Sequence, residues 1–331
     1  MATARSPKVV VIGGGTGSFA VLSSLKYYVR DLTAVVNMVD DGGSTGQLRD
    51  DLGVLPPGDV RQCLVALSES SETMRDLFNY RFGEGSLHGH SFGNLFLTAL
   101  EKTTGSFATA VQMASQVLNI TGRVVPVTLK HTDLVLARPD GATLVGQHTV
   151  ELADFGGQRP ELSLKPQAKL NPAAGRAITE ADLVVIAPGN LYASLAPALI
   201  VQGMAEALAA TSAKVIYVAN LVTKPGQTDG YQVHDYVDEL ERLTTPGLID
   251  YVLYNSHQPS PQLLKAYAQA GEYAVAVDAQ HLAAASYEAI GEDLVSDTIP
   301  KLSAADKLIP RTLIRHDGDK VARLIMRIYF S

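Results

Sequence analysis

The chain has 331 residues, of which 46% are hydrophobic and 18% charged, and its formal net charge is −7. This is ordinary globular composition, long enough for one large domain or two smaller ones. The acidic balance excludes the basic face that a nucleic-acid-binding protein needs. A single cysteine, Cys63, excludes an intrachain disulfide framework, and its apolar helical context VRQCLVAL indicates a buried filler rather than a nucleophile.

No apolar stretch approaches the ~20 residues that a membrane-spanning helix requires. The N-terminal MATARSPK is followed by the short run VVVI and then by glycines, which does not fit a signal peptide. We therefore expect a cytoplasmic protein without a membrane span.

From residue 8 to about 120, short apolar runs alternate with helical patterns. The runs at 9–12 and 33–39 predict strands, and apolar residues at helical spacing predict helices over 19–29 and 60–69. Residues 121–168 are rich in Val and Thr and carry the hairpin signal Pro139-Asp140-Gly141, so they predict a small β-rich insertion.

The α/β alternation resumes after residue 168. Strands are expected at 183–187, 214–219, 249–254 and 274–277, with helical patterns at 195–210 and 319–330. Such alternation is typical of an α/β, Rossmann-like fold with three layers, in which helices cover both faces of a mostly parallel sheet. We expect one composite domain over 1–331: a nucleotide-binding part (1–120), the insertion (121–168) and a C-terminal part completing the sheet (169–331).

The first turn reads Gly13-Gly14-Gly15-Thr16-Gly17-Ser18, between a strand and a helix. Glycines permit close backbone approach, and a helix start offers unpaired N–H groups to an anion, so a phosphate site is favoured over a merely tight turn. Ser18 stands where a dinucleotide fingerprint has its third glycine. The ligand therefore stays open at this point.

The second strand leads into Asp40-Asp41-Gly42-Gly43-Ser44. Two acids and several glycines exceed what ribose binding requires, so the loop suits a flexible ligand site or a magnesium site on the paired carboxylates. A solvated acidic turn is the alternative. Arg49 could reach a phosphate or lie on the surface.

The segment LPPGD enters another helix, where Asp59 and Gln62 resemble a capping box. Capping does not explain Arg61, because a cation is unfavourable in the first turn of a helix unless an anion lies nearby.

Two histidines, His88 and His90, lie in GHSFGN, but no third ligand is spaced to complete a zinc site. We interpret this segment as a polar turn that presents Asn94 to a ligand. Two later loops, APGNLYAS (187–194) and NLVTKPGQT (220–228), also follow predicted strands, where ligands of such sheets bind. None of these loops shows a Ser-His-Asp or Cys-His arrangement.

Taken in order, GGGTG, DDGGSTGQLR, LGVLPPGDVRQCL, GHSFGNL, APGNLY and NLVTKPGQTDGY resemble successive motifs of the YvcK/CofD family, from about residue 8 to the C-terminus. The ending IRHDGDKVARLI is similar to the YvcK branch. The resemblance implies a Rossmann-like core with a nucleotide over the first glycine turn.

The two branches of this family imply different functions. YvcK proteins, named gluconeogenesis factors, bind UDP-sugars such as UDP-N-acetylglucosamine and support cell shape, wall synthesis and growth on gluconeogenic carbon sources, without established turnover. CofD proteins transfer phospholactate from a guanosine diphosphate donor to a deazaflavin with magnesium. We expect the YvcK function, with CofD-type transfer on Asp40 or Asp41 as the alternative. An NAD-dependent oxidoreductase is a second alternative, disfavoured by Ser18.

Residue patterns and resemblance together give one set of candidate ligand-binding residues. Tyr267 and Arg315 enter it through the resemblance, which implies contacts to the UDP-sugar. The set comprises Gly13, Gly14, Gly15, Thr16, Gly17, Asp40, Asp41, Gly42, Gly43, Ser44, Asp59, Arg61, Asn94, Gly189, Asn190, Tyr192, Asn220, Tyr267 and Arg315.

Three departures from the family pattern concern the ligand more than the fold. The usual GPGSLYTS reads APGNLYAS, Gln62 replaces a commoner asparagine, and PGQT replaces PGET. We expect a nucleotide-sugar ligand, no nucleic acid, magnesium only as an option, and a homo-oligomer, namely a dimer.

Overall fold

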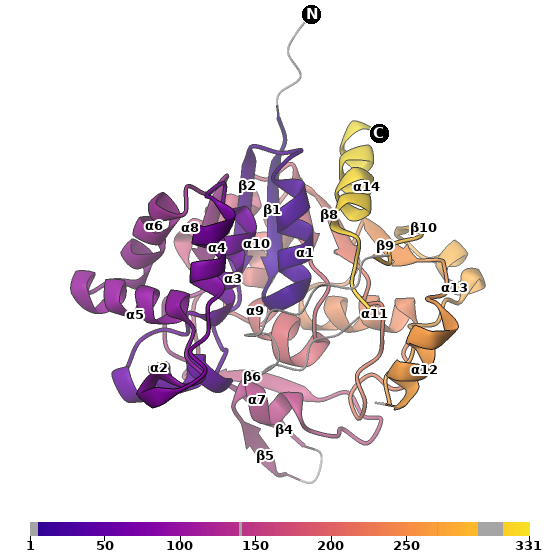
Figure 1. The fold of residues 1–331 in the computed structure, drawn as a ribbon. Helices are drawn as coiled ribbons and strands as arrows, with labels where there is room; N and C mark the ends of the chain where they lie inside the picture. The colour runs from indigo at the N-terminus through magenta and orange to yellow at the C-terminus, as the bar shows by residue number, and fades with distance from the viewer. Residues whose placement is uncertain (1–5, 139–140, 270, 297–313) are drawn as a thin grey trace, which may run out of the picture.

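A seven-stranded parallel sheet lies between two layers of helices in the computed structural model, which describes residues 6–138, 141–269, 271–296 and 314–331 (Figure 1). The strand order is β10-β9-β8-β7-β1-β2-β3. The strands are β1 (Lys8–Gly13), β2 (Asp31–Val36), β3 (Arg123–Pro126), β7 (Leu183–Ile186), β8 (Lys214–Val218), β9 (Tyr251–Asn255) and β10 (Glu288–Glu292). The expected α/β, three-layer, Rossmann-like fold is confirmed.

The central strands are buried because helices cover both faces of the sheet. In Figure 1, α1, α3 and α14 lie in front of the sheet, and α8, α9 and α10 lie behind it. All four residues of β7 are buried, as are all but the first residues of β1 and β2. Continuous Val, Ile and Leu runs suit such a doubly covered sheet, where alternation with polar residues would bury unpaired polar groups.

The helices before the insertion carry much of the front layer. Ser71, Ser91 and Ser106 cap three of them through their side chains, as helix starts favour. They are α1 (Gly15–Leu25), α2 (Gly43–Leu52), α3 (Gly58–Leu67), α4 (Glu72–Asn79), the 3₁₀ turn η1 (Gly85–Leu87), α5 (Phe92–Thr104) and α6 (Phe107–Val117).

The remaining helices follow the insertion. A π-helical turn, η2, runs directly into α9. They are α8 (Pro172–Thr179), η2 (Leu191–Leu195), α9 (Ala196–Leu199), α10 (Met204–Ala210), α11 (Val233–Leu243), α12 (Pro261–Gln269), α13 (Ala279–Ala284) and α14 (Gly318–Phe330).

A three-stranded antiparallel sheet lies beyond the carboxyl ends of β1 and β2 (Figure 1). It consists of β4 (Asp133–Ala137), β5 (Thr143–Val145) and β6 (Glu161–Lys165), with helix α7 (Gln147–Glu151) after β5. The predicted β-rich insertion is therefore present as a small sheet. The predicted insertion began at residue 121, but β3 pairs with β2 in the main sheet. β4 and β5 pair as expected of a hairpin, although Pro139 and Asp140 of its turn signal lie outside the described residues.

Several predicted elements differ from the structure. The predicted strand at 274–277 is wrong, because Ala274 and Ala276 each form one isolated bridge to the 222–232 loop and do not join the sheet. The last strand is instead β10, whose sequence EAIGE is half exposed at the sheet edge and so lacks an apolar run. The predicted helix over 195–210 is interrupted before Met204, because Gly203 has a positive φ.

The final helix packs as its spacing predicts. Val321, Leu324, Ile325 and Ile328 are buried on one face of α14, which lies against α1. At the start of α14, a Cβ on Gly318 would clash with the carbonyl oxygen of Ala20. The C-terminal helix therefore packs beside α1 in the same layer and helps to hold it in place (Figure 1), and α1 carries the glycine turn at its N-terminus.

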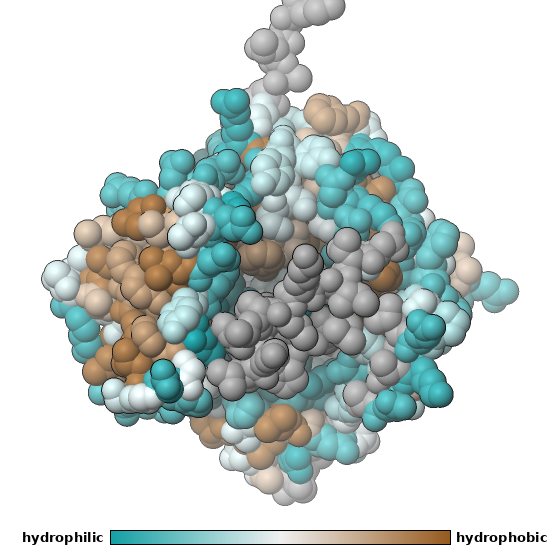
Figure 2. Space-filling view, in the orientation of Figure 1, coloured by the Kyte–Doolittle hydropathy of each residue, from teal (hydrophilic) through white to brown (hydrophobic). Residues whose placement is uncertain are grey.

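Exposed apolar side chains gather over α4, α5 and α6, the brown area at the left of Figure 2. Leu77, Tyr80, Met113 and Val117 are each 40–51% exposed there. Exposed apolar area of this kind is typical of protein–protein contact surfaces. Dimer formation stays a prediction.

Truncation of the α14 core face tests this packing. Ile325→Ala leaves a cavity between α14 and α1, and we expect it to lower the free energy of unfolding by about 2–5 kcal/mol. Arg323→Ala, which removes an exposed ion pair to Asp319 on the same helix and a hydrogen bond to Tyr28, should lower it far less. Urea unfolding of both variants gives the comparison. Equal losses would contradict the assigned faces.

Candidate functional site

The strand order of the sheet changes direction between the neighbouring strands β1 and β7. β1 to β3 extend one way from β1, and β7, paired with β1 on its other side, starts the second half. Ligands of open α/β sheets bind at such a switch point, outside the carboxyl ends of the strands. Two turns meet there, Gly13–Gly17 after β1 and Pro188–Asn190 after β7.

The two turns touch at Gly17. A Cβ on this residue would clash with the carbonyl oxygen of Pro188, so only glycine permits the approach. Gly13 and Gly15 have positive φ angles that favour glycine, and Gly14 is the N-cap of α1 without a side-chain cap. The first turn of α1 therefore offers backbone N–H groups toward the space above it.

That space is a cavity of about 320 Å³. Eight of the predicted residues line it: Gly14, Gly15, Thr16, Gly17, Gly189, Asn190, Asn220 and Arg315. Six further polar residues that were not predicted also line it: Glu151, Ser194, Thr223, Lys224, Glu272 and His316. Lys224 lay in a loop that the sequence singled out, but the two glutamates carry no motif that could have indicated them.

The two acids of the DDGG loop point to different partners. Asp40 accepts a hydrogen bond from the Gly42 N–H at 3.0 Å, and burial raises the pKa of its carboxyl. Asp41 accepts a hydrogen bond from the backbone N–H of His148 at 2.7 Å, at the start of α7. The hydrogen bonds of the two carboxylates therefore lead to different segments, while the charge of Asp41 still raises the pKa of Asp40, and a magnesium ion shared by the two stays a prediction.

Asp40 also acts on Asp59. Burial, and next the charge of Asp40, raise the pKa of Asp59 to about 7, while the Gly15 N–H, Arg61 and Asn37 act in the opposite direction. The carboxyl fills the space beside the glycine turn, since a Cβ on Gly14 would clash with it. Asp59 is not the predicted cap of α3, whose N-cap is Pro57 without a side-chain hydrogen bond.

Arg61 is buried in the first turn of α3, where its charge lowers the pKa of Asp59. It donates to the carbonyl oxygens of Asn94 at 3.0 Å and Asn79 at 2.6 Å. Asn94 in turn donates to the Ser44 hydroxyl at 3.2 Å. These residues join the DDGG loop to α3 and α5 behind the glycine turn, so they support the site without lining the cavity.

Three other residues of this region do not line the switch-point cavity. Gly42 is the N-cap of α2 and Gly43 has a positive φ, so both shape the loop. Arg49 pairs with Asp50 and with Asp133 of the insertion.

The second turn is held by its asparagines. Asn190 accepts from the N–H groups of Tyr192 and Ala193 at the start of η2, at 3.2 and 3.1 Å. Asn220 donates to the Gly189 carbonyl at 2.7 Å. The Tyr192 side chain is fully buried, and its hydroxyl lies 2.9 Å from that of Tyr231. Tyr192 therefore lies under the cavity rather than in its wall.

Tyr267 is also buried. It packs with Leu221 and Ile314, and its hydroxyl accepts a hydrogen bond from the Ile314 N–H. This contact holds the segment that carries Arg315 into the cavity wall. Next to it, burial lowers the pKa of His316 to about 4, and its neutral ring lies 3.0 Å from the Ala219 carbonyl.

Comparisons with known proteins place this chain. The family model described as 2-phospho-L-lactate transferase CofD matches residues 9–295. The chain belongs to the CofD family. Relatives named gluconeogenesis factor are 36% identical in Bacillus subtilis, over 97% of this chain and 98% of the relative, and 37% identical in Listeria innocua, over 98% and 97%. The chain thus lies in the gluconeogenesis-factor (YvcK) branch.

A solved structure agrees with this placement. A crystal structure of a UPF0052-family protein from Bacillus halodurans matches with a TM-score of 0.89 at 34% identity, over 98% of this chain and 100% of that chain.

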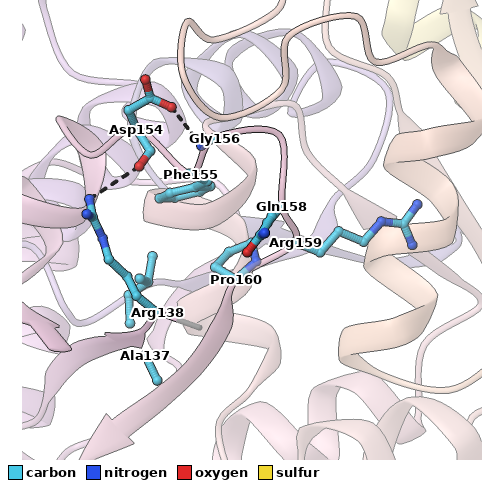
Figure 3. Close-up of a pocket in the computed structure, with 9 residues that line it drawn as sticks. Ala137, Arg138, Asp154, Phe155, Gly156, Gln158, Arg159 and Pro160 are labelled. Atoms are coloured by element: carbon cyan, nitrogen blue, oxygen red, sulfur yellow. Dashed lines mark hydrogen bonds between the residues drawn. The ribbon is translucent and has the colours of Figure 1, made fainter. Parts of the chain in front are cut away.

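This CofD-family chain has a second cavity of about 330 Å³ between β4 and the segment 154–160 (Figure 3). Arg138 there donates to the carbonyl oxygen of Asp154 at 3.2 Å, and the Asp154 carboxylate accepts from the Gly156 N–H at 2.8 Å. None of the predicted site residues lines this cavity, and no helix start opens onto it, so we assign the functional site to the switch point.

Other predicted features can be placed. Cys63 is buried, and desolvation raises the pKa of its thiol, as expected of a filler rather than a nucleophile. Within the described ranges, no three His, Cys, Asp or Glu side chains are grouped to hold a metal ion. No helix of the described chain is long and apolar enough to cross a membrane.

The raised pKa of Asp59 predicts a pH dependence. An Asp in the unfolded chain ionises near pH 4, whereas the pKa of Asp59 in the folded protein is about 7. Between these two pH values the folded state binds more protons than the unfolded state. The free energy of unfolding that this group contributes therefore falls as the pH rises. Asp59→Asn removes this effect. Relative to the native protein, we expect the variant to gain stability from pH 4.5 to 7.5, by on the order of a few kcal/mol. Urea unfolding across this range measures it, with exposed Asp238→Asn as control, and a pH-independent difference for Asp59→Asn would contradict the raised pKa.

Proposed function

We propose that this chain binds a nucleotide-sugar of the UDP-N-acetylglucosamine type in the switch-point cavity. The observation that carries the proposal is that one cavity gathers two strand-to-helix turns and two cations, Lys224 and Arg315. A diphosphate needs several hydrogen-bond donors and positive charges within a few ångströms. This wall offers backbone N–H donors at the start of α1 and the cationic side chains of Lys224 and Arg315.

The glycine turn supplies the backbone part of the anion site. α1 has 11 residues and no side-chain cap or acidic residue in its first turn, so its N-terminal N–H groups and dipole suit a phosphate. Arg315 can hold a diphosphate through paired hydrogen bonds. The charge of Lys224 is partly balanced by Glu272, whose pKa is raised by burial and lowered by that lysine.

Family membership supports the biological part of the proposal. Close relatives carry the name gluconeogenesis factor, and we propose that this chain is a cytoplasmic regulator of the YvcK type. In that role it supports growth on gluconeogenic carbon sources, cell shape and wall synthesis. In this proposed regulatory role, the binding of the ligand and not its chemical conversion carries the signal.

The Asp40–Asp59 pair favours one alternative, a CofD-type phosphotransferase. A half-buried carboxyl (Asp40) and a buried one (Asp59) beside the proposed phosphate site can hold a magnesium ion through oxygen ligands. Burial raises the pKa of both, and the charge of Asp40 raises that of Asp59 further. When bound, the ion would neutralise phosphate charge. The residues themselves would keep the pair oriented: the Gly42 N–H fixes Asp40, and Gly15 and Asn37 lie beside Asp59.

Titration calorimetry separates these functions. We expect UDP-N-acetylglucosamine to bind the purified protein in the micromolar range, and a guanosine diphosphate nucleotide and NAD to bind far more weakly, with and without magnesium. If only NAD bound, the result would favour the oxidoreductase alternative. Product formed from a guanosine diphosphate-linked phospholactate donor would contradict the absence of turnover.

Removal of either cation tests the diphosphate contact. Lys224→Met and Arg315→Met keep the apolar stem but lose a charged hydrogen-bond donor, worth about 1.5–3 kcal/mol, so UDP-N-acetylglucosamine should bind roughly 10- to 100-fold more weakly. Lys102→Met, an exposed lysine on α5, should leave the affinity unchanged. Unchanged affinity in both cavity variants would contradict the site.

A further inference from the structure

The wall of the switch-point cavity carries opposite charges in different places. Arg315 and Lys224 supply the positive charges, and Glu151 supplies a carboxylate from the insertion. Glu151 lies near enough to Asp40 for its charge to raise the pKa of that acid, which puts the carboxylate on the DDGG side of the cavity. The insertion thus adds negative charge to a site whose other walls suit an anion.

The structure fastens helix α7, which carries Glu151, at both ends. At its start, Asp41 accepts from the His148 N–H at 2.7 Å. At its end, the buried Gln227 side chain donates to a row of carbonyl oxygens at 2.7, 3.0 and 3.2 Å, those of Val150, Glu151 and Ala153. A helix of five residues has little stability of its own, so these contacts from the DDGG loop and from the 220–228 loop determine where Glu151 lies.

The loop over 220–228 also connects Glu151 with the side of the cavity that carries Lys224. Lys224 lies three residues before Gln227, and the Phe155 N–H donates to the Gly226 carbonyl at 2.6 Å. A Cβ on Gly226 would lie only 3.0 Å from the Asp154 backbone, so the loop and the insertion are tightly packed. The spacing between the lysine and the glutamate is therefore built into the fold.

A carboxylate in this position repels phosphate oxygens and accepts hydrogen bonds. The ligand group beside Glu151 must then be uncharged and rich in O–H or N–H donors, which describes a sugar ring and excludes a terminal phosphate. We propose that Glu151 is the specificity residue of this site and selects nucleoside diphosphates that carry a sugar over the bare nucleotides. This inference rests on the proposed function.

Calorimetric titration with UDP, UDP-glucose and UDP-N-acetylglucosamine tests the assignment. The native protein should bind both UDP-sugars at least about tenfold more tightly than UDP, because hydrogen bonds to a charged acceptor form only with the sugar. Glu151→Gln should lose most of this preference through weaker sugar binding, while UDP binds equally or more tightly as the repulsion disappears. Glu206→Gln, an exposed glutamate on α10, should match the native protein.

A second variant tests the positioning of α7. Gln227→Met removes the contacts at the end of this helix, so it should reduce the preference for UDP-sugars in the same direction while UDP still binds.

The outcomes separate the two proposals. If Glu151→Gln keeps the native preference, or weakens UDP and UDP-sugars by the same factor, Glu151 is not the specificity residue, although the proposed function stands. If the native protein binds UDP but prefers no sugar, the specificity inference also fails. If the native protein binds none of the three ligands, the proposed function itself fails.

Discussion

The site depends on one close approach, that of Gly17 in the first turn of α1 to the carbonyl oxygen of Pro188. Strands β1 and β7 are neighbours in the sheet, so their turns open at the same edge, but neighbouring strands alone would leave two separate turns. Because Gly17 has no side chain, the N-terminus of α1 can lie directly against the turn that follows β7. The backbone of the glycine turn and the residues Asn190 and Asn220 then line a single cavity. On the other side, α14 packs on α1 through Gly318 and its apolar face, which holds this arrangement.

Behind the cavity, the polar residues of the DDGG, PPGD and GHSFGN loops form a supporting layer. Asp59 fills the space beside Gly14, and Arg61 links Asn94 to α4 through Asn79. Buried polar groups of this kind are stable only when most of them are paired, so changing one residue alters the position of several loops. Motifs that look in the sequence like direct ligand contacts can therefore support the glycine turn instead. The raised pKa of Asp59 shows that such burial disfavours the ionised form of its carboxyl.

Much of the fold could be predicted from sequence, and less of the site. Strands such as β1 and β7 are continuous apolar runs, so their burial and parallel pairing follow from pattern alone, whereas β10 is polar at an edge and gave no signal. The glycine turns were recognisable because close approach needs a particular residue type. Asp41, Tyr192 and Tyr267 were expected at the ligand, but one holds the insertion and two are buried. Glu151 and Glu272 went unrecognised, since only tertiary packing brings them to the cavity. The orientation of a side chain and its neighbours in the fold are set by tertiary packing. The spacing of residues along the sequence does not give them.

We expect the nucleotide-sugar to bind over the α1 N-terminus and not in the second cavity beside β4. Hydrogen–deuterium exchange, with and without saturating UDP-N-acetylglucosamine, tests this location directly. We expect slower exchange in the peptides covering 14–20, 188–195 and 220–224, and little change in those covering 134–138 and 154–160. Protection confined to 134–138 and 154–160, or none at all with saturating ligand, would contradict it.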